Sequence, residues 1–337
     1  MPTIKSNPCP SSDNASSLSE QGAQITHYLQ AGYPGLYLVS PEVQRVEAEL
    51  HSIAQALDYN LCFWSVVTGL VETKSKKLHQ AQDPLEALQT VEQLPEKSMV
   101  LLKDFHLFLQ DANPILLAKL KEVLLEAKTQ SKTLIILGCR LCLPPELERE
   151  ITVIDFALPG KEALGIVLDG ILKSAKLKSV PGECREAALS AATGLTTIEA
   201  ENAFALSVVE TRAITPAVIA REKAHALKKN GLLEIIETAA SLDSIGGLDV
   251  LKGWLLKRRH AFSEQARAYR LPTPKGLLII GLAGTGKSLT AKATASVFGV
   301  PLLRLDAGRI FAGLVGQSES NLRTVMQTAE AIAPCVL

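Results

Sequence analysis

The chain has 337 residues, of which 47% are hydrophobic and 21% charged, a composition typical of a globular protein with room for two domains. Its 35 Lys and Arg residues balance 35 Asp and Glu residues, so the net charge gives no general attraction to nucleic acid or to an anionic membrane. No apolar run approaches the ~18 residues of a membrane span, so we expect no membrane partner.

Residues 1–21 are rich in Ser, Pro and Asn and lack the apolar stretch of a secretory signal. They contain no Arg and carry Asp13 and Glu20, which argues against a transit peptide. A segment of this composition buries too little apolar surface to fold, so we expect a disordered leader over residues 1–21.

Residues 22–230 are expected to form one domain that begins with alternating strands and helices. Strands are expected at 35–40, 61–67, 98–105, 133–139 and 151–159, with helices at 41–57, 83–94 and 112–130. Ser40 and Asp83 suit helix N-caps, and Pro41 suits a first helical position. Strands separated by helices imply parallel pairing, so the fold class is α/β. From Lys161 to about Lys229 the pattern is purely helical and predicts a helical cap.

Residues 231–243 are expected to be a linker to a second α/β unit over residues 244–337. Strands are expected at 275–280 and 301–306, with a further strand beginning at 335–337. Helices are expected at 248–269, 289–299 and 318–333.

The segment Gly281-Leu-Ala-Gly-Thr-Gly-Lys-Ser288 matches the pattern G-x-x-x-x-G-K-[ST] between an expected strand and an expected helix. Glycines at 281, 284 and 286 let the backbone turn tightly and direct N–H groups inward, and the helix adds its positive end. Lys287 would reach the β- and γ-phosphates, and the Ser288 hydroxyl would ligate Mg²⁺. The context favours this P-loop over a glycine-rich turn with an exposed lysine and predicts ATP and Mg²⁺ as cofactors.

From Ser244 onward the sequence resembles the AAA ATPases, and nearly the whole chain is similar to AAA proteins of cyanobacteria and algal plastid genomes. Those proteins place a divergent N-terminal region before one AAA module, and they imply a cytoplasmic or plastid-stromal location. The resemblance implies that the segment Ile245-Gly246 lies against the adenine. The nucleotide-binding residues it implies are Ile245, Gly246, Gly281, Gly284, Thr285, Gly286, Lys287, Ser288 and Leu289.

The same resemblance places the first pore loop at Leu314-Val315-Gly316, where the family usually has an aromatic residue. A weak grip on a threaded polymer and a locally packed loop both stay open for Leu314. The family's Asp-Glu pair, polar sensor, arginine fingers and lid would all follow Leu337. We therefore expect a C-terminally truncated AAA domain, assign no catalytic residue, and expect the strand at 276–280 to lack its sheet neighbours.

The strand–helix order and helical cap of residues 22–230 also resemble an AAA module. Ser40-Pro41-Glu42 nevertheless stands where the P-loop would be, and Asp104-Phe105 stands where the two acids would be. We expect a degenerate AAA-like domain without a P-loop. For Asp104, an N-cap or surface role is favoured over a metal-binding one.

The six cysteines are scattered, which fits a reducing compartment. Cys139-Arg-Leu-Cys142 is a lone C-x-x-C pair, and no second pair stands at a spacing that would complete a zinc site. The pair follows a strand and precedes Leu-Pro-Pro, whereas redox pairs usually lie at a helix N-terminus. A structural role is favoured.

Two functional hypotheses stay open. In the first, the chain is an ATP-binding AAA protein whose complete form hydrolyses ATP as a homo-oligomeric ring and remodels a protein partner, while residues 1–337 alone are hydrolysis-deficient. In the second, it is a non-enzymatic partner-binding module with an inert AAA remnant. A nucleic-acid motor is disfavoured by the net charge of 0 and by short basic runs.

Overall fold

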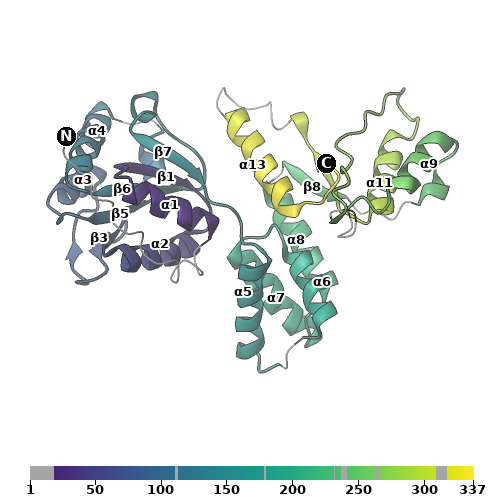
Figure 1. Cartoon of the computed structure of the whole chain (residues 1–337), viewed down its shortest axis with the longest axis horizontal. Coiled ribbons are helices and arrows are strands. Elements are labelled where there is room, and N and C mark those ends of the chain that lie inside the picture. The colour runs from purple at the N-terminus through teal and green to yellow at the C-terminus, as the bar shows by residue number, and fades with distance from the viewer. Residues whose placement is uncertain are drawn as a thin grey trace, which may run out of the picture. The chain divides into compact units, whose positions relative to one another are not determined.

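The structure, a computed structural model, describes residues 19–110, 113–177, 180–230, 232–236, 241–262, 266, 268–308 and 317–337. It divides into two compact units, Met1–Ala157 and Leu158–Leu337 (Figure 1). Residues 1–18 of the expected leader lie outside the described residues, and Ser19 already caps the first helix. Within the described part of the chain, no helix is long and apolar enough to cross a bilayer.

The first unit is built on a seven-stranded sheet in the order β4-β3-β2-β5-β6-β1-β7. Its strands are β1 (Gly35–Val39), β2 (Asn60–Ser65), β3 (Gly69–Glu72), β4 (Leu78–His79), β5 (Ser98–Lys103), β6 (Thr133–Gly138) and β7 (Ile151–Asp155). The expected parallel pairing is confirmed for β2, β5, β6, β1 and β7. The antiparallel strands β3 and β4, which we did not expect, extend the β2 edge.

Four helices cover this sheet: α1 (Glu20–Gln30), α2 (Val43–Leu57), α3 (Pro84–Glu92) and α4 (Pro114–Thr129). Successive β1 residues point to opposite faces, so Leu36 and Leu38 join one core cluster while Tyr37 joins the other. The Leu36 cluster contains buried residues of α1 and α2, and the Tyr37 cluster contains those of α3 and α4. The sheet is therefore the middle layer of three.

Helix α2 does not start where its sequence suggested. Ser40 continues the strand, because its N–H donates to the carbonyl of Gly138, and its Oγ then accepts from the N–H of Glu42 at 3.1 Å. Glu42 is the N-cap and Val43 the first helical residue, so the expected roles of Ser40 and Pro41 are wrong. Asp83 caps α3 as predicted, accepting from the N–H of Leu85 at 2.8 Å.

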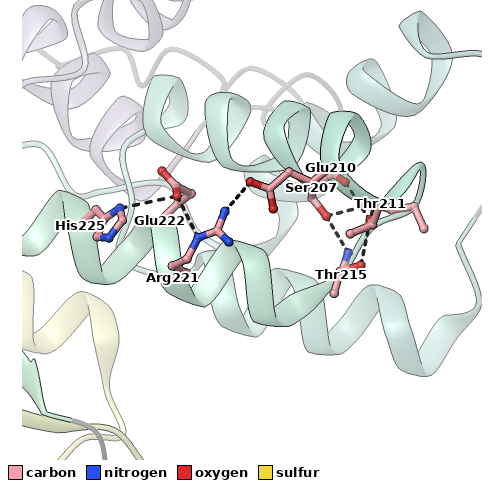
Figure 2. Close-up of polar contacts among 8 residues, drawn as sticks. Ser207, Glu210, Thr211, Thr215, Arg221, Glu222 and His225 are labelled. Carbon is pink, nitrogen blue, oxygen red and sulfur yellow. Dashed lines mark hydrogen bonds and ion pairs between the residues drawn. The ribbon is translucent and has the colours of Figure 1, made fainter.

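The second unit begins with helices α5 (Lys161–Ser174), α6 (Gly182–Ala192), α7 (Thr197–Thr211) and α8 (Pro216–Asn230), as the helical pattern predicted. They enclose their own core, which includes Leu168, Phe204 and Ile219. Figure 2 shows the polar contacts between α7 and α8, where Arg221 donates to Glu210 at 2.6 Å. The division between the two units, after Ala157, falls inside the range 22–230 that we expected to be one domain.

The rest of the second unit contains α9 (Asp249–Arg258), α11 (Lys287–Phe298) and α13 (Gln317–Ile332). Strand β8 (Leu233–Ile236) pairs antiparallel with β9 (Leu302–Leu305), so the expected linker over 231–243 contains a strand. Val336 forms a parallel bridge to Leu302, which agrees with the strand expected at 335–337. Residues 275–280, by contrast, form no strand.

Candidate nucleotide-binding site

The loop before α11 has the backbone that its glycines predicted. Gly284 and Gly286 both have φ of +83°, a conformation that L side chains rarely adopt. Gly281 is needed for a different reason, since an added Cβ would lie 2.8 Å from Oγ1 of Thr285. The Thr285 hydroxyl in turn donates to the carbonyl of Leu282 at 2.8 Å and braces the turn. A tight loop thus leads directly into the helix.

The N-terminus of α11 is open. Gly286 is its N-cap, no side chain caps the first turn, and that turn carries no acidic residue. The first amides of a helix have no partner within it, and together with the helix dipole they favour an anion. The helix starts at Lys287, two residues before the start that we expected, so Lys287 and Ser288 lie in this first turn.

Lys287 folds back over the loop. Its Nζ donates to the carbonyl of Gly281 at 2.9 Å and also to that of Leu282. The Ser288 side chain is exposed beside it, and Leu289 is half-buried. An ammonium group, a hydroxyl and unpaired amides are the donors and ligands that a Mg²⁺–triphosphate requires, so these residues fit the expected cofactors. None of the described residues forms a cluster of three His, Cys, Asp or Glu side chains that could hold a metal by itself.

The segment expected to contact adenine packs against the same helix. A 3-10 helix, η4 (Leu242–Ser244), contacts α11, and Ile245 follows it as a buried residue. Gly246 is exposed. Lys252 on α9 donates to the carbonyl of Ile245 at 2.6 Å and secures this segment, a contact for which the sequence offered no motif. The structure therefore places the 3-10 helix that directly precedes Ile245 against the helix that follows the loop.

The apolar segment before the loop differs most from expectation. Leu278 is 84% exposed and Ile280 is 85% exposed, because no described strand pairs with residues 275–280. The prediction of a strand here is wrong for this structure. The expected pore loop, Leu314-Val315-Gly316, lies outside the described residues.

The corresponding turn of the first unit is closed. The turn 40–42 contains no glycine, and the Glu42 carboxylate is buried at the N-terminus of α2, where the Arg45 Nε lies 3.6 Å away. The Arg45 guanidinium stacks 4.7 Å from the centre of the Phe156 ring and donates to the carbonyl of Ala157. Loss of hydration lowers the pKa of Arg45. A buried carboxylate of the chain itself thus lies beside the first turn of α2, paired with Arg45.

In the first unit, the position expected for the pair of acidic residues is occupied by Asp104 and Phe105. Asp104 is exposed with φ of +56° and caps nothing with its side chain, so it is a surface acid. Phe105 begins the 3-10 helix η2 (Phe105–Phe108) and is fully buried, with its ring centre 5.5 Å from that of Trp64. A buried aromatic residue of the core, Phe105, therefore stands where the second acidic residue would be.

Comparisons with known protein families match three successive segments of the chain. The model of the SpoVK-like AAA ATPase N-terminal domain matches residues 21–156, and that of the SpoVK-like AAA ATPase second domain matches residues 162–230. The model of the ATPase family associated with various cellular activities (AAA) matches residues 277–337. These boundaries separate the sheet, the helical bundle and the loop-bearing segment.

Full-length relatives support the same grouping. The chain is 37% identical over 315 residues to "Uncharacterized AAA domain-containing protein ycf46" of Trieres chinensis, which covers 92% of this chain and 63% of the relative. It is 37% identical over 320 residues to the ycf46 protein of Pyropia yezoensis, with 92% and 63% covered. A shorter match, 35% over 103 residues, joins 30% of the chain to 15% of "ATP-dependent zinc metalloprotease FTSH 6, chloroplastic" of Oryza sativa. The chain spans about 63% of the length of the ycf46 relatives named here.

Proposed function

The chain belongs to the AAA ATPases, with two SpoVK-like domains ahead of its AAA segment, and we propose that it binds Mg²⁺–ATP at the loop before α11. The observation that carries this proposal is the pair of glycines at positive φ, Gly284 and Gly286, leading into an uncapped helix whose first residues are Lys287 and Ser288. Few other ligands match such a dense array of donors.

Each residue has a defined role in this proposal. The loop amides and the first turn of α11 receive the phosphate oxygens. Lys287 would exchange its two loop carbonyls for the β- and γ-phosphates, and Ser288 would hold the metal, which would supply positive charge against the phosphates. Ile245 and Gly246 would lie against the adenine. Thr285 would complete the phosphate-binding loop, and Leu289 belongs to the first turn of α11.

Turnover is a separate part of the proposal. Phosphoryl transfer needs a group that positions the attacking water as well as a phosphate site. After β9, residues 306–337 contain no adjacent pair of acidic residues. We propose that residues 1–337 alone bind ATP without hydrolysing it. For the whole protein we propose a ring of identical subunits, in the cytoplasm of a cyanobacterium or the plastid stroma, that hydrolyses ATP and remodels a protein partner rather than nucleic acid or membrane.

The test compares two lysines of the same helix. Lys287→Ala should weaken Mg²⁺–ATP binding roughly 10- to 100-fold, because a charged hydrogen bond contributes ~1.5–3 kcal/mol. Lys292→Ala, on the same helix beyond the loop, is the matched control and should bind like the parent chain. Calorimetry gives the affinity, and phosphate release in the same samples should stay at background. Equal binding by all three proteins contradicts the site, and release that depends on Lys287 contradicts the absence of turnover.

The buried Glu42 supports a second function for the first unit. A closed helix end leaves that unit without a phosphate site, so its sheet and helices are available for binding a partner rather than a nucleotide. Under this alternative, a partner captured by the intact chain should bind equally well to the Lys287→Ala variant, with and without Mg²⁺–ATP.

A further inference from the structure

A second group of reactive side chains lies in the first unit, whereas the nucleotide-binding loop belongs to the second. Strands β5 and β6 are parallel neighbours, and η2 and the C-x-x-C segment directly follow their carboxyl ends. This edge is where open α/β sheets place their ligand sites. His106 on η2 and Cys139 after β6 meet there, with His106 Nε2 and Cys139 Sγ 3.7 Å apart.

His106 is held rigidly and almost wholly buried. It is 2% exposed, and its ring lies so close to Gly138 that an added Cβ there would be 2.8 Å from Nδ1. Among the residues that the structure describes, none forms a hydrogen bond to Nδ1. Burial lowers the pKa of His106 despite nearby Asp104, and Arg140 also lowers it, so the ring is neutral at pH 7.

The missing partner of Nδ1 determines which ring nitrogen carries the proton. A buried N–H without an acceptor is more unfavourable than a buried nitrogen lone pair, so the proton belongs on Nε2. Nε2–H then donates to Cys139 Sγ. This contact holds the Cys139 sulfur against a hydrogen-bond donor, and the thiolate is the nucleophilic form of cysteine.

The core holds the backbone of the C-x-x-C segment at Arg140 and Cys142. The buried Tyr37 hydroxyl donates to the carbonyl of Arg140 at 2.7 Å and accepts from the N–H of Cys142 at 3.1 Å. Burial raises the pKa of Tyr37 far above its usual value, so this hydroxyl keeps its proton. Arg140 is also bonded through its side chain to Gln110. The Cys139 thiol is therefore held at the surface and Cys142 stays half-buried three residues later.

We propose that Cys139 is a reactive thiol that exchanges with low-molecular-weight disulfides, with Cys142 as the resolving thiol and His106 as the positioning residue. The Cys139 thiolate attacks one sulfur of the small disulfide, forms a mixed disulfide and releases one thiolate, which takes a proton. The Cys142 thiolate then attacks the Cys139 sulfur and releases the second thiol. Two cysteines are oxidised to one disulfide, and the small disulfide is reduced to two thiols.

A zinc site is the main competing interpretation of the same residues. Among the residues that the structure describes, no group of three His, Cys, Asp or Glu side chains is arranged to hold a metal. The sequence favoured a purely structural role for the pair because it lacks a helix N-terminus. The contact with His106, which lies 33 residues earlier in the chain, is the observation that reverses this preference.

The first test uses the full chain and oxidised glutathione. At pH 7 the parent chain should lose two hydrogens in mass and yield a Cys139–Cys142 linked peptide. Cys142→Ser should instead accumulate one glutathione on Cys139, and Cys139→Ser should do neither. A linkage between other cysteines, or no mixed disulfide in Cys142→Ser, overturns the proposal.

The second test isolates His106 through a pH profile. Cys139 should react with iodoacetamide faster than Cys184, which is half-buried in α6, because the Cys139 sulfur is exposed and hydrogen-bonded to His106. In His106→Gln the pH midpoint of Cys139 alkylation should rise, whereas His27→Gln, at an exposed histidine of α1, should leave it unchanged. An unchanged midpoint in a folded His106→Gln chain removes His106 from the proposal. If that variant does not fold, His106→Phe, which keeps a ring of similar size, takes its place.

Discussion

Lys223 buries an amino group inside the second unit. It is 7% exposed on α8, the helix that packs against α6, α7 and β8. Loss of hydration lowers its pKa to about 8, with Cys335 nearby, whose own pKa is raised by burial. Because the pKa of an unfolded lysine is near 10.4, the folded chain holds this proton less tightly than the unfolded chain, and a charged Lys223 destabilises the fold.

This residue predicts a pH dependence. Between pH 8 and about 10.4 the unfolded state binds a proton that the folded state has lost, so the Lys223 contribution makes the fold more stable as pH rises. Lys223→Met should therefore raise the free energy of unfolding at pH 7, by about 3 kcal/mol at most, and this advantage should shrink by pH 10. Urea unfolding at both pH values measures it.

Because Lys223 and Cys335 shift each other's pKa, making the comparison in a Cys335→Ser background isolates the contribution of the lysine. Lys173→Met, at an exposed position of α5, is the control and should change stability little at either pH. A difference between Lys223→Met and the parent that stays the same at pH 7 and pH 10 would show that Lys223 keeps its usual pKa.

Helices α11 and α2 each follow an apolar segment, but the groups at their N-termini differ in charge. Helix α11 begins after Gly286 with free amides and a lysine, whereas α2 begins after Glu42, whose buried carboxylate faces Arg45. Negative charge at a helix N-terminus is stabilising whether a ligand or the chain supplies it. The N-terminus of α11 is therefore open to an anion from solution, whereas α2 has a buried carboxylate of the chain itself beside its first turn.

This contrast predicts where nucleotide should protect the backbone. Hydrogen exchange of the full chain with Mg²⁺–ATP should slow at the amides of 287–291 in α11, because ligand binding suppresses local opening there. The amides of 43–47 in α2 should exchange at the same rate with and without nucleotide. Protection confined to α2 would mean that the first unit holds the nucleotide site.

At the scale of the whole molecule, packing is uneven. The sheet of the first unit has a buried cluster on each face, and both clusters include residues of four or more strands and helices. The cluster around β8, β9 and α13 is small by comparison. Residues 275–282 expose Leu278, Ile280 and Leu282 and belong to no helix or strand. Segments with few buried contacts open most readily.

Proteolysis should follow this difference. Limited trypsin digestion should cut first near Arg270 and Lys275 and leave a fragment that contains the whole first unit, because cleavage needs a locally unfolded backbone. Mass mapping of early fragments identifies the order of cuts, and Lys103 at the end of β5 serves as the internal reference. Early cutting at Lys103, or slow exchange of the 277–280 amides, would show that the segment before the loop is covered.

The sequence by itself determined the features that depend on local rules. Alternating apolar segments and helices predicted the parallel sheet, and Gly284 and Gly286 favoured the tight loop, since residues with a side chain rarely adopt φ of +83°. Only the tertiary structure decided which distant segments meet. It paired β8 with β9, continued the strand through Ser40, left 275–280 unpaired and brought His106 to Cys139. Such contacts join residues tens of positions apart, and their free energy depends on packing that no short window of sequence contains.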